Sequence, residues 1–423
     1  MFLEIENIGK IRNAKIELKG VTVIAGKNNT GKSTFGKVLY CMFNAFYDME
    51  NTIRNERRKD IKDILARNLV TSNSNIEKPH FNNEMIDEVL SAGKNLSKLH
   101  VRKVLNLINT SDDLYAEIFK KIKSSLAIKD DDIQKAIITR YFTAEFNGQI
   151  NHIDRKDNKG KIIRAVKNNI VEVSILNNRC SLLSIDEKFR ILYDAVYIDT
   201  PLVMDELPFT PYRWYEYFYS TRHSSPKNYH HRENLKNKLT SKSSDRTIIE
   251  EALTDKKLNK LLAKISVAIP GKFTIEENYR LLFHEEGLKK PLHLSNMSAG
   301  IKTFLIIKRL LEAGEIKERG VLILDEPEIH LHPEWQLRFA EILILLQKEF
   351  NLTILLTTHS PYFLNAIEVY SDKYGRKDSC NYYLASTVEN ATLVREVTAN
   401  TDEIYKQLAM PFKTLESMEY DGD

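Results

Sequence analysis

The chain has 423 residues, of which 42% are hydrophobic and 28% are charged, as in a globular protein with room for two or three structural units. Its formal net charge of +4 is too small to indicate nucleic-acid binding by itself, and no apolar run is long enough to span a membrane. The cysteines Cys41, Cys180 and Cys380 lack metal or disulfide spacing, so we expect a cytoplasmic location without membrane association.

The first 46 residues contain strand patterns followed by one helical pattern. Strands are predicted at Leu3–Ile5, Ala14–Leu18 and Val21–Ala25, and the helix is predicted over Phe35–Phe46. We assign residues 1–46 to the N-terminal part of a nucleotide-binding head.

A phosphate-binding loop of the form G-x-x-x-x-G-K-[ST] lies between the last of these strands and the helix. It comprises Gly26, Lys27, Asn28, Asn29, Thr30, Gly31, Lys32, Ser33 and Thr34. Such a loop wraps backbone N–H groups around phosphates at a helix N-terminus. Lys32 would reach the terminal phosphates, and Ser33 would place its hydroxyl on Mg²⁺. This stretch predicts binding of a nucleoside triphosphate.

Residues 47–147 show apolar side chains at three- and four-residue steps, interrupted by polar breaks, which predicts a large, mainly helical insertion. The acidic run Asp130–Asp132 precedes one of these helices. A metal nuclease is one interpretation of that run, but acids also favour the first turn of a helix, and we expect this structural role.

The next segments are predicted from their changing composition. Residues 148–189 read as a β segment of the head, and residues 190–205 contain a buried strand, Ala195–Asp199, that returns to it. Residues 206–264 hold an aromatic-rich stretch, a basic stretch and a helix over Thr247–Ile265. The basic stretch, from Arg222 to Arg246, is either a flexible loop or a segment that docks a partner or phosphate backbone.

Residues 265–398 carry a second set of nucleotide-related signals. After a predicted hairpin comes the apolar run Val321–Leu324, which ends in Asp325 and Glu326. A strand buried on both faces reads as such a run, and ligands bind at its carboxyl end. Asp325 is therefore a candidate Mg²⁺ ligand, and Glu326 is a candidate general base for the attacking water.

The order of these motifs resembles that of ATP-binding-cassette (ABC) ATPases. Ser298, Ala299 and Gly300 match the register of the family's signature loop, and His359 ends the buried strand Thr353–Thr358 as the family's switch histidine does. The resemblance implies an α/β fold: a P-loop head with a mixed sheet, flanking helices and an antiparallel β subdomain. It also implies ATP and Mg²⁺ as cofactors and a homodimer that shares its ATP sites. No residue matches the family's Gln-loop.

The segment Asp325-Glu326-Pro327-Glu328, followed by Leu331-His332-Pro333, resembles the overcoming-lysogenization-defect (OLD) class of ATPases. The stretch after His359 reads as a hairpin, then a C-terminal helix and tail over residues 399–423, with no nuclease centre of its own. This layout resembles the ATPase subunits of two-component anti-phage systems, the Septu ATPases (PtuA) first and the PARIS ATPases (AriA) second.

The resemblance to those subunits implies an ATPase that acts as sensor and scaffold for a separately encoded nuclease. An HNH nuclease is the first expectation and a TOPRIM nuclease the second. Nucleic acid is a further expected partner, bound either by this chain or only through the complex, and assembly beyond a dimer is left open. The alternative is a DNA-repair ATPase of the RecF/Rad50 type that binds DNA as an ATP-closed dimer.

Overall fold

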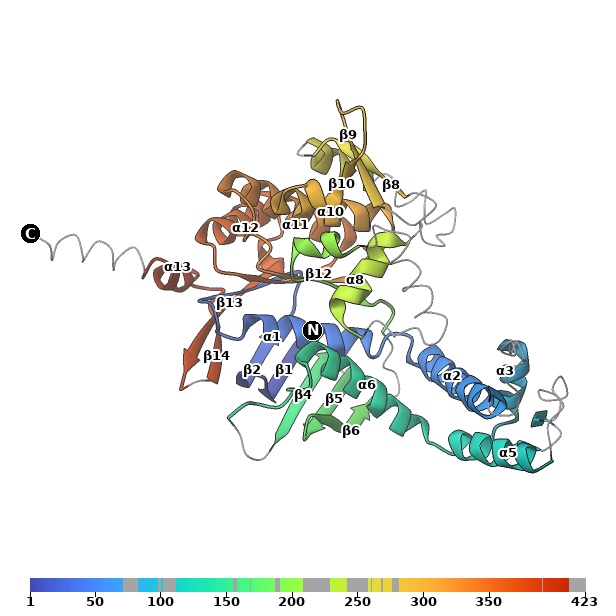
Figure 1. Ribbon diagram of the computed structural model, residues 1–423. Helices are drawn as coiled ribbons and strands as arrows, with labels where there is room; N and C mark the ends of the chain where they lie inside the picture. The colour runs from blue at the N-terminus through green and yellow to red at the C-terminus, as the bar shows by residue number, and fades with distance from the viewer. Residues whose placement is uncertain are drawn as a thin grey trace, which may run out of the picture. The chain divides into compact units, whose positions relative to one another are not determined.

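The computed structural model describes residues 1–70, 83–97, 100–101, 112–154, 158–167, 169–186, 191–207, 229–241, 258–259, 261–267, 269–275, 281–389 and 391–410. The chain divides into two compact units, shown in Figure 1. We call Met1–Tyr47 together with Thr139–Asp423 the head, and Asp48–Ile138 the helical unit.

Within the described residues of the head, eleven strands form one mixed sheet in the order β6-β5-β4-β1-β2-β14-β13-β3-β12-β11-β7. Their bounds are β1 Phe2–Ile8, β2 Ile11–Glu17, β3 Val21–Gly26, β4 Lys159–Val166, β5 Asn169–Leu176, β6 Arg179–Ile185, β7 Ala195–Ile198, β11 Val321–Asp325, β12 Thr353–Thr358, β13 Cys380–Val388 and β14 Ala391–Glu396. A separate antiparallel sheet contains β8 Gly271–Ile275, β9 Leu281–Glu285 and β10 Leu292–His293.

The parallel part of the large sheet, β13-β3-β12-β11-β7, is the centre of the head. Every residue of β3 and β7 is buried, which explains why these segments read as continuous apolar runs. In register, Leu324 of β11 lies opposite Leu356 of β12 and Ile198 of β7. The carboxyl ends of β3, β11, β12 and β7 therefore meet at one edge of the sheet.

The antiparallel part contains β6, β5, β4, β1 and β2. In β5, buried residues alternate with more exposed ones, as expected where one face packs against the protein. Because β4 pairs with β1 along Phe2–Glu6, the predicted β segment continues the sheet that the first residues of the chain begin.

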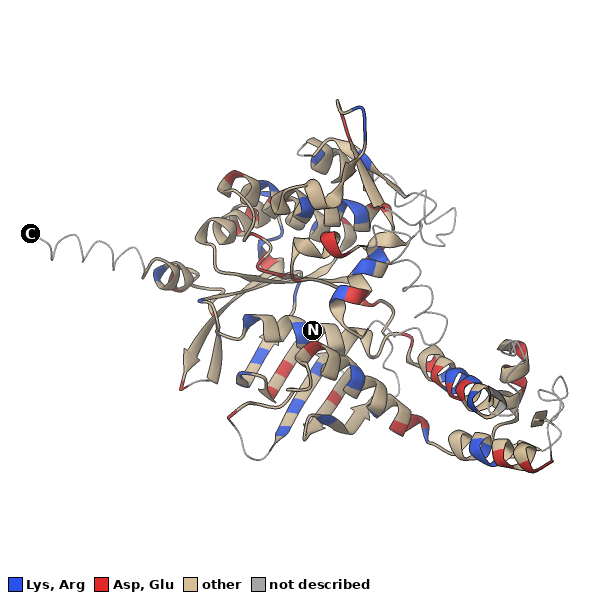
Figure 2. Ribbon diagram, viewed as in Figure 1, with Lys and Arg blue, Asp and Glu red and all other residues tan. Residues whose placement is uncertain are grey.

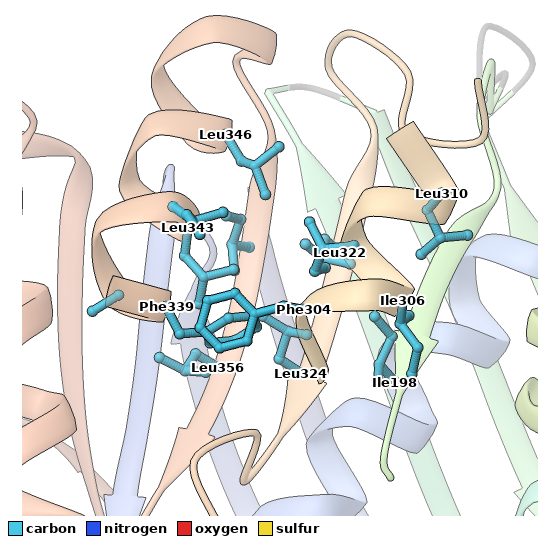
Figure 3. Packing of buried hydrophobic residues seen from close by; sticks show 14 of the residues in the cluster. Ile198, Phe304, Ile306, Leu310, Leu322, Leu324, Phe339, Leu343, Leu346 and Leu356 are labelled. Carbon is cyan, nitrogen blue, oxygen red and sulfur yellow. The ribbon is translucent and has the colours of Figure 1, made fainter. Parts of the chain in front are cut away.

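Helices cover both faces of the parallel strands. Besides the last part of α6, which begins in the helical unit, the helical elements described in the head are α1 Lys32–Asn44, η2 Pro201–Glu206, α8 His231–Thr240, η3 Leu294–Asn296, α10 Ala299–Glu312, α11 Pro333–Phe350, α12 Pro361–Lys373, η4 Lys377–Ser379 and α13 Asp402–Leu408. Figure 3 shows Phe304 of α10 and Phe339 of α11 packed over Leu324 and Leu356. Since Ile323 points to the opposite face and lies against Gly36, α1 covers the other side.

The helical unit contains α2 Met49–Val70, α3 Asn83–Ala92, η1 Gly93–Asn95, α5 Asp112–Leu126 and the first part of α6 Asp130–Phe146. Its own core includes Ile61, Leu65, Ile86, Tyr115 and Ile118, at the helical spacing that the sequence shows. Figure 2 shows basic and acidic residues interspersed along α2.

The acidic run of the helical unit lies at the start of a helix, as predicted. Asp130, Asp131 and Asp132 occupy the first turn of α6, where carboxylates interact favourably with the helix dipole. Asp130 also lies 2.6 Å from Arg57 of α2. Within the part of the chain that the structure describes, no helix combines the length and apolarity needed to cross a bilayer.

The predicted fold class is confirmed: the head is an α/β structure with a mixed sheet and flanking helices. One interpretation of the basic stretch needs correction. Instead of a continuous flexible loop, it contains α8, whose Arg232, Lys236 and Lys238 pair with carboxylates. The aromatic-rich stretch over 209–219 and most of the predicted helix over 247–265 lie outside the described residues.

Candidate nucleotide-binding site

The phosphate-binding loop connects the buried strand β3 to α1. Gly31 has a φ of +79°, and a Cβ there would lie 2.4 Å from the Thr392 hydroxyl, so only glycine fits without rearrangement. A Cβ on Gly26 would lie 2.3 Å from the carbonyl oxygen of Ala385. Asn29, with a φ of +65°, also adopts the left-handed conformation that asparagine tolerates. The loop's shape thus depends on contact with the β13–β14 hairpin.

Lys32 is the first residue of α1, and only 4% of it is exposed. Its ammonium group donates to the carbonyl oxygens of Gly26, at 2.9 Å, and Lys27, at 2.8 Å. The same group lies 3.0 Å from Glu326 Oε1. The structure therefore brings the lysine of the loop into direct contact with the carboxylate of the acidic pair, although the two are far apart in sequence.

Asp325 is the last residue of β11 and accepts hydrogen bonds from two hydroxyl groups. Thr357 of β12 donates to Oδ1, and Tyr197 of β7 donates to Oδ2 at 3.3 Å. Both donors are neutral, so the negative charge of the carboxylate is not offset by a cation in these bonds. Together with the Ser33 hydroxyl, this carboxylate offers the hard oxygen ligands that Mg²⁺ prefers, and the residues fit that ion.

Glu326 has a φ of +48°, an uncommon conformation for a residue with a side chain. Its backbone N–H donates to the Thr357 hydroxyl at 3.0 Å, which helps to hold this turn. The turn directs the Glu326 carboxylate toward Lys32 and His359, whose Nδ1 lies 3.3 Å from Glu326 Oε2. Strained backbone of this kind is often found at functional sites.

The charges of this cluster shift the pKa values of its members. The bond to His359, together with the Lys32 ammonium, lowers the pKa of Glu326 to about 2, so its carboxylate is ionised at neutral pH. The same bond raises the pKa of His359 above its usual range. Glu328 lies behind this pair, where burial raises its pKa while Thr358 and the His359 backbone N–H donate to it.

The signature-loop residues belong to the helix layer formed by α10 and α11, on the face of the sheet opposite to α1. Ser298 is the N-cap of α10 and accepts a hydrogen bond from the Ile301 backbone, while Ala299 begins the helix. A Cβ on Gly300 would lie 2.8 Å from the carbonyl oxygen of His330, so this loop packs against the segment after the acidic pair. His332 in that segment caps α11. Within the described residues, the signature loop thus packs against the segment around His330, on the face of the sheet that α10 covers.

A cavity of about 330 Å³ adjoins the phosphate-binding loop. Its lining comprises Gly9, Lys10, Asn28, Asn29, His152, Ile153, Asp154 and Thr387. Lys10 donates to Asn29, and His152 Nδ1 accepts from the Asp154 backbone at 3.2 Å. The other nitrogen of His152 is buried and has no hydrogen-bond partner among the described residues. Sequence reasoning missed Lys10 and His152, which carry no motif.

The end of β7 is a second part of the site that sequence reasoning left without a role. Tyr197 contacts Asp325, and Asp199 follows β7 directly. Asp199 binds the guanidinium of Arg232 through Nε at 2.8 Å and Nη2 at 2.6 Å. A buried strand that ends in Tyr-Ile-Asp-Thr-Pro was the available signal, but only its pairing with β11 shows that it lies beside the strand that ends in Asp325.

A phosphate-binding loop follows the central parallel strand β3, and an acidic pair stands at the end of β11, the next strand but one in the same sheet. These features define the head as a P-loop nucleotide-binding domain. The sequence model of the AAA ATPase domain family matches residues 1–364. The chain belongs to this family.

Three solved structures with similar folds are heads of SMC proteins. An SmcHead bound to the C-winged helix domain of ScpA is 10% identical, with 95% of this chain and 98% of that chain covered and a TM-score of 0.46. The SMC head domain from Thermotoga maritima is 11% identical, with 94% of this chain and 98% of that chain covered and a TM-score of 0.38. An Smc head domain with an extended coiled coil, bound to the C-terminal domain of ScpA derived from Pyrococcus furiosus, is 12% identical. It is covered to 98%, this chain is covered to 99%, and the TM-score is 0.42.

Proposed function

We propose that this protein is the ATP-binding and ATP-hydrolysing subunit of a two-component bacterial anti-phage system, in which it regulates a separately encoded nuclease. The ATPase part of this proposal agrees with the family of the chain. The observation that carries the ATPase part is the cluster of Lys32, Glu326 and His359, in which Lys32 Nζ lies 3.0 Å from Oε1 of the candidate base Glu326.

The cluster supports hydrolysis by electrostatics and positioning. A triphosphate in the loop competes with Glu326 for the Lys32 ammonium, because both are anions. Once released from Lys32, the Glu326 carboxylate is free to orient the attacking water, and His359 is placed beside it. Asp325 and Ser33 would hold Mg²⁺, which neutralises developing charge on the phosphates. The cavity beside Asn28 and Asn29 has room for the rest of the nucleotide.

Two copies of the chain are part of the proposal. The N-terminus of α10, with Ser298, Ala299 and Gly300, presents backbone N–H groups and the positive end of a helix dipole, which suit an anion. In the proposed dimer this surface closes on the ATP held by the other copy. ATP then favours the closed dimer through its greater affinity for that state, and hydrolysis relaxes it.

The role in defence is supported by sequence resemblance and by the place of the resembling residues. In the segment that resembles OLD-class ATPases, Glu328 accepts a hydrogen bond from the His359 backbone, and His332 caps α11. This arrangement links the nucleotide cluster with the surface of the proposed dimer. A nuclease partner of the HNH type is the first expectation, and a TOPRIM nuclease is the second.

The test is purification of the tagged protein from cells that also express the neighbouring genes, followed by mass spectrometry of the eluted complex. We expect a nuclease subunit in a fixed ratio to the ATPase, with Glu326→Gln retaining the complex under ATP. A preparation that contains no nuclease but binds duplex DNA in an ATP-dependent and salt-sensitive way would instead identify a DNA-repair ATPase of the RecF/Rad50 type.

A further inference from the structure

Tyr197 lies beneath the candidate magnesium ligand and is only 1% exposed. Because β7 pairs with β11 in parallel, the Tyr197 ring lies beside the end of β11, and its hydroxyl donates to Asp325 Oδ2 at 3.3 Å. A Cβ added at Gly36 of α1 would lie 3.1 Å from both the hydroxyl oxygen and Cζ of Tyr197. The glycine inside α1 therefore leaves the space that this hydroxyl occupies.

A stacked histidine holds the tyrosine ring from its other side. The rings of Tyr197 and His231 are stacked with centroids 4.2 Å apart and an angle of 28° between their planes. His231 begins α8 and is 3% exposed. The ring of Tyr40 lies 6.3 Å from that of Tyr197 in a tilted arrangement. Tyr197 is thus enclosed by rings from α1 and α8.

Two carboxylates fix the histidine. His231 Nδ1 lies 2.8 Å from Glu145 Oε2, and its backbone N–H donates to Glu145 Oε1 at 2.6 Å. His231 Nε2 lies 3.2 Å from Asp199 Oδ2, the same oxygen that Arg232 binds. Glu145, which is 1% exposed, belongs to α6. Buried charged groups need such partners, because an unpaired one is costly to remove from water.

These contacts form a continuous path from α6 through His231 and Tyr197 to Asp325. We propose that Tyr197 is a positioning residue for the magnesium ion of the nucleotide: its hydroxyl orients the Asp325 carboxylate, and the Glu145–His231 pair keeps its ring in place. The proposal rests on Asp325 as a magnesium ligand in the proposed function. Hydrogen bonds to a ligating carboxylate commonly change metal affinity or activity by about 10–100-fold when they are removed.

The variant that tests this is Tyr197→Phe, which removes the hydroxyl and keeps the ring. Its matched control is Tyr383→Phe, because Tyr383 of β13 is also buried and its hydroxyl accepts a hydrogen bond from the Glu17 backbone rather than contacting Asp325. The measurement is binding of a fluorescent ATP analogue over a series of magnesium concentrations, with a parallel series in EDTA.

For Tyr197→Phe we expect the magnesium concentration at half-maximal binding to rise about tenfold, while binding in EDTA stays as in the wild type. Tyr383→Phe should leave both unchanged. Equal magnesium requirements in Tyr197→Phe and the wild type would overturn the positioning role alone. A wild-type protein without any magnesium-dependent nucleotide binding would overturn both this role and the proposed function.

A second variant keeps the test decisive should Tyr197→Phe fold poorly. Gly36→Ala places a methyl group against the Tyr197 hydroxyl, while alanine by itself favours a helix. We expect it to displace the Tyr197 hydroxyl and to raise the magnesium requirement severalfold, while binding in EDTA stays as in the wild type. A magnesium requirement equal to that of the wild type would contradict an action through the hydroxyl.

Discussion

In the head, strands that are buried on both faces hold the nucleotide residues at their carboxyl ends, whereas in the helical unit amphipathic helices enclose a small core of their own. The head's sites come from segments far apart in sequence, as the contact between Lys32 and Glu326 shows. The helical unit is built from one continuous segment. This difference teaches that the chemistry depends on the sheet, and that the helical unit can be altered separately.

The largest expected effect concerns the lysine of the phosphate-binding loop. Lys32→Ala removes the only side-chain cation that the described contacts place against both the loop carbonyls and Glu326. We expect loss of measurable ATP binding and turnover, as determined by titration calorimetry and phosphate release. Lys348→Ala, an exposed lysine of α11, is the control and should behave as the wild type.

The second prediction separates binding from turnover within the head. Glu326→Gln keeps the size of the side chain and removes its charge, so ATP should still bind while hydrolysis falls about 10²–10⁴-fold. Light scattering in the presence of ATP should then show an accumulated dimer. Glu172→Gln, on the antiparallel strand β5, is the control. Hydrolysis by Glu326→Gln at the wild-type rate would show that another group activates the water.

The third prediction tests the independence of the helical unit. Leu65→Ala removes a fully buried side chain from its core and should destabilise that unit by about 2–5 kcal/mol. Hydrogen exchange should become faster in α2, α3 and α5, with ATP affinity of the head unchanged. Ile128→Ala, at a 49% exposed position of the same unit, should have little effect. A change in ATP affinity for Leu65→Ala alone would contradict the separation of the two regions.

The smallest effect concerns pH and the Asp199 carboxylate of the head. Burial alone would raise the pKa of Asp199, but bonds to His231 and Arg232 outweigh it and lower the pKa to about 2. Because the folded-state pKa lies below the unfolded value, this stabilisation is present above about pH 4 and is lost as the pH falls toward 2. Urea unfolding should show a loss of about 2 kcal/mol across that range, which Asp199→Asn should lack.

The same contrast explains what the sequence could predict. Strands β3, β11 and β12 are continuous apolar runs next to recognisable motifs, so their place in the head and the residues at their ends could be predicted. The helical unit was predictable as helices from its spacing. Its compactness as a separate unit follows from contacts between helices, which no single stripe of apolar residues reveals.

The parts that sequence reasoning missed depend on pairing between distant residues. Lys238 looks like one charge in a basic stretch, yet in the structure it is 8% exposed and bound to Asp194 and Glu315. Glu145 and His231 carry no motif, and only the fold places them against each other. A polar composition thus predicts exposure well when the partners are local and poorly when they come from other segments.

Helix α6 extends from Asp130 to Phe146, so one rod of backbone hydrogen bonds carries residues of the helical unit at its start and Glu145 near its end. Such a rod is about 25 Å long. One uninterrupted helix therefore passes from the segment of the helical unit into the segment of the head, and its single ladder of backbone hydrogen bonds belongs to both.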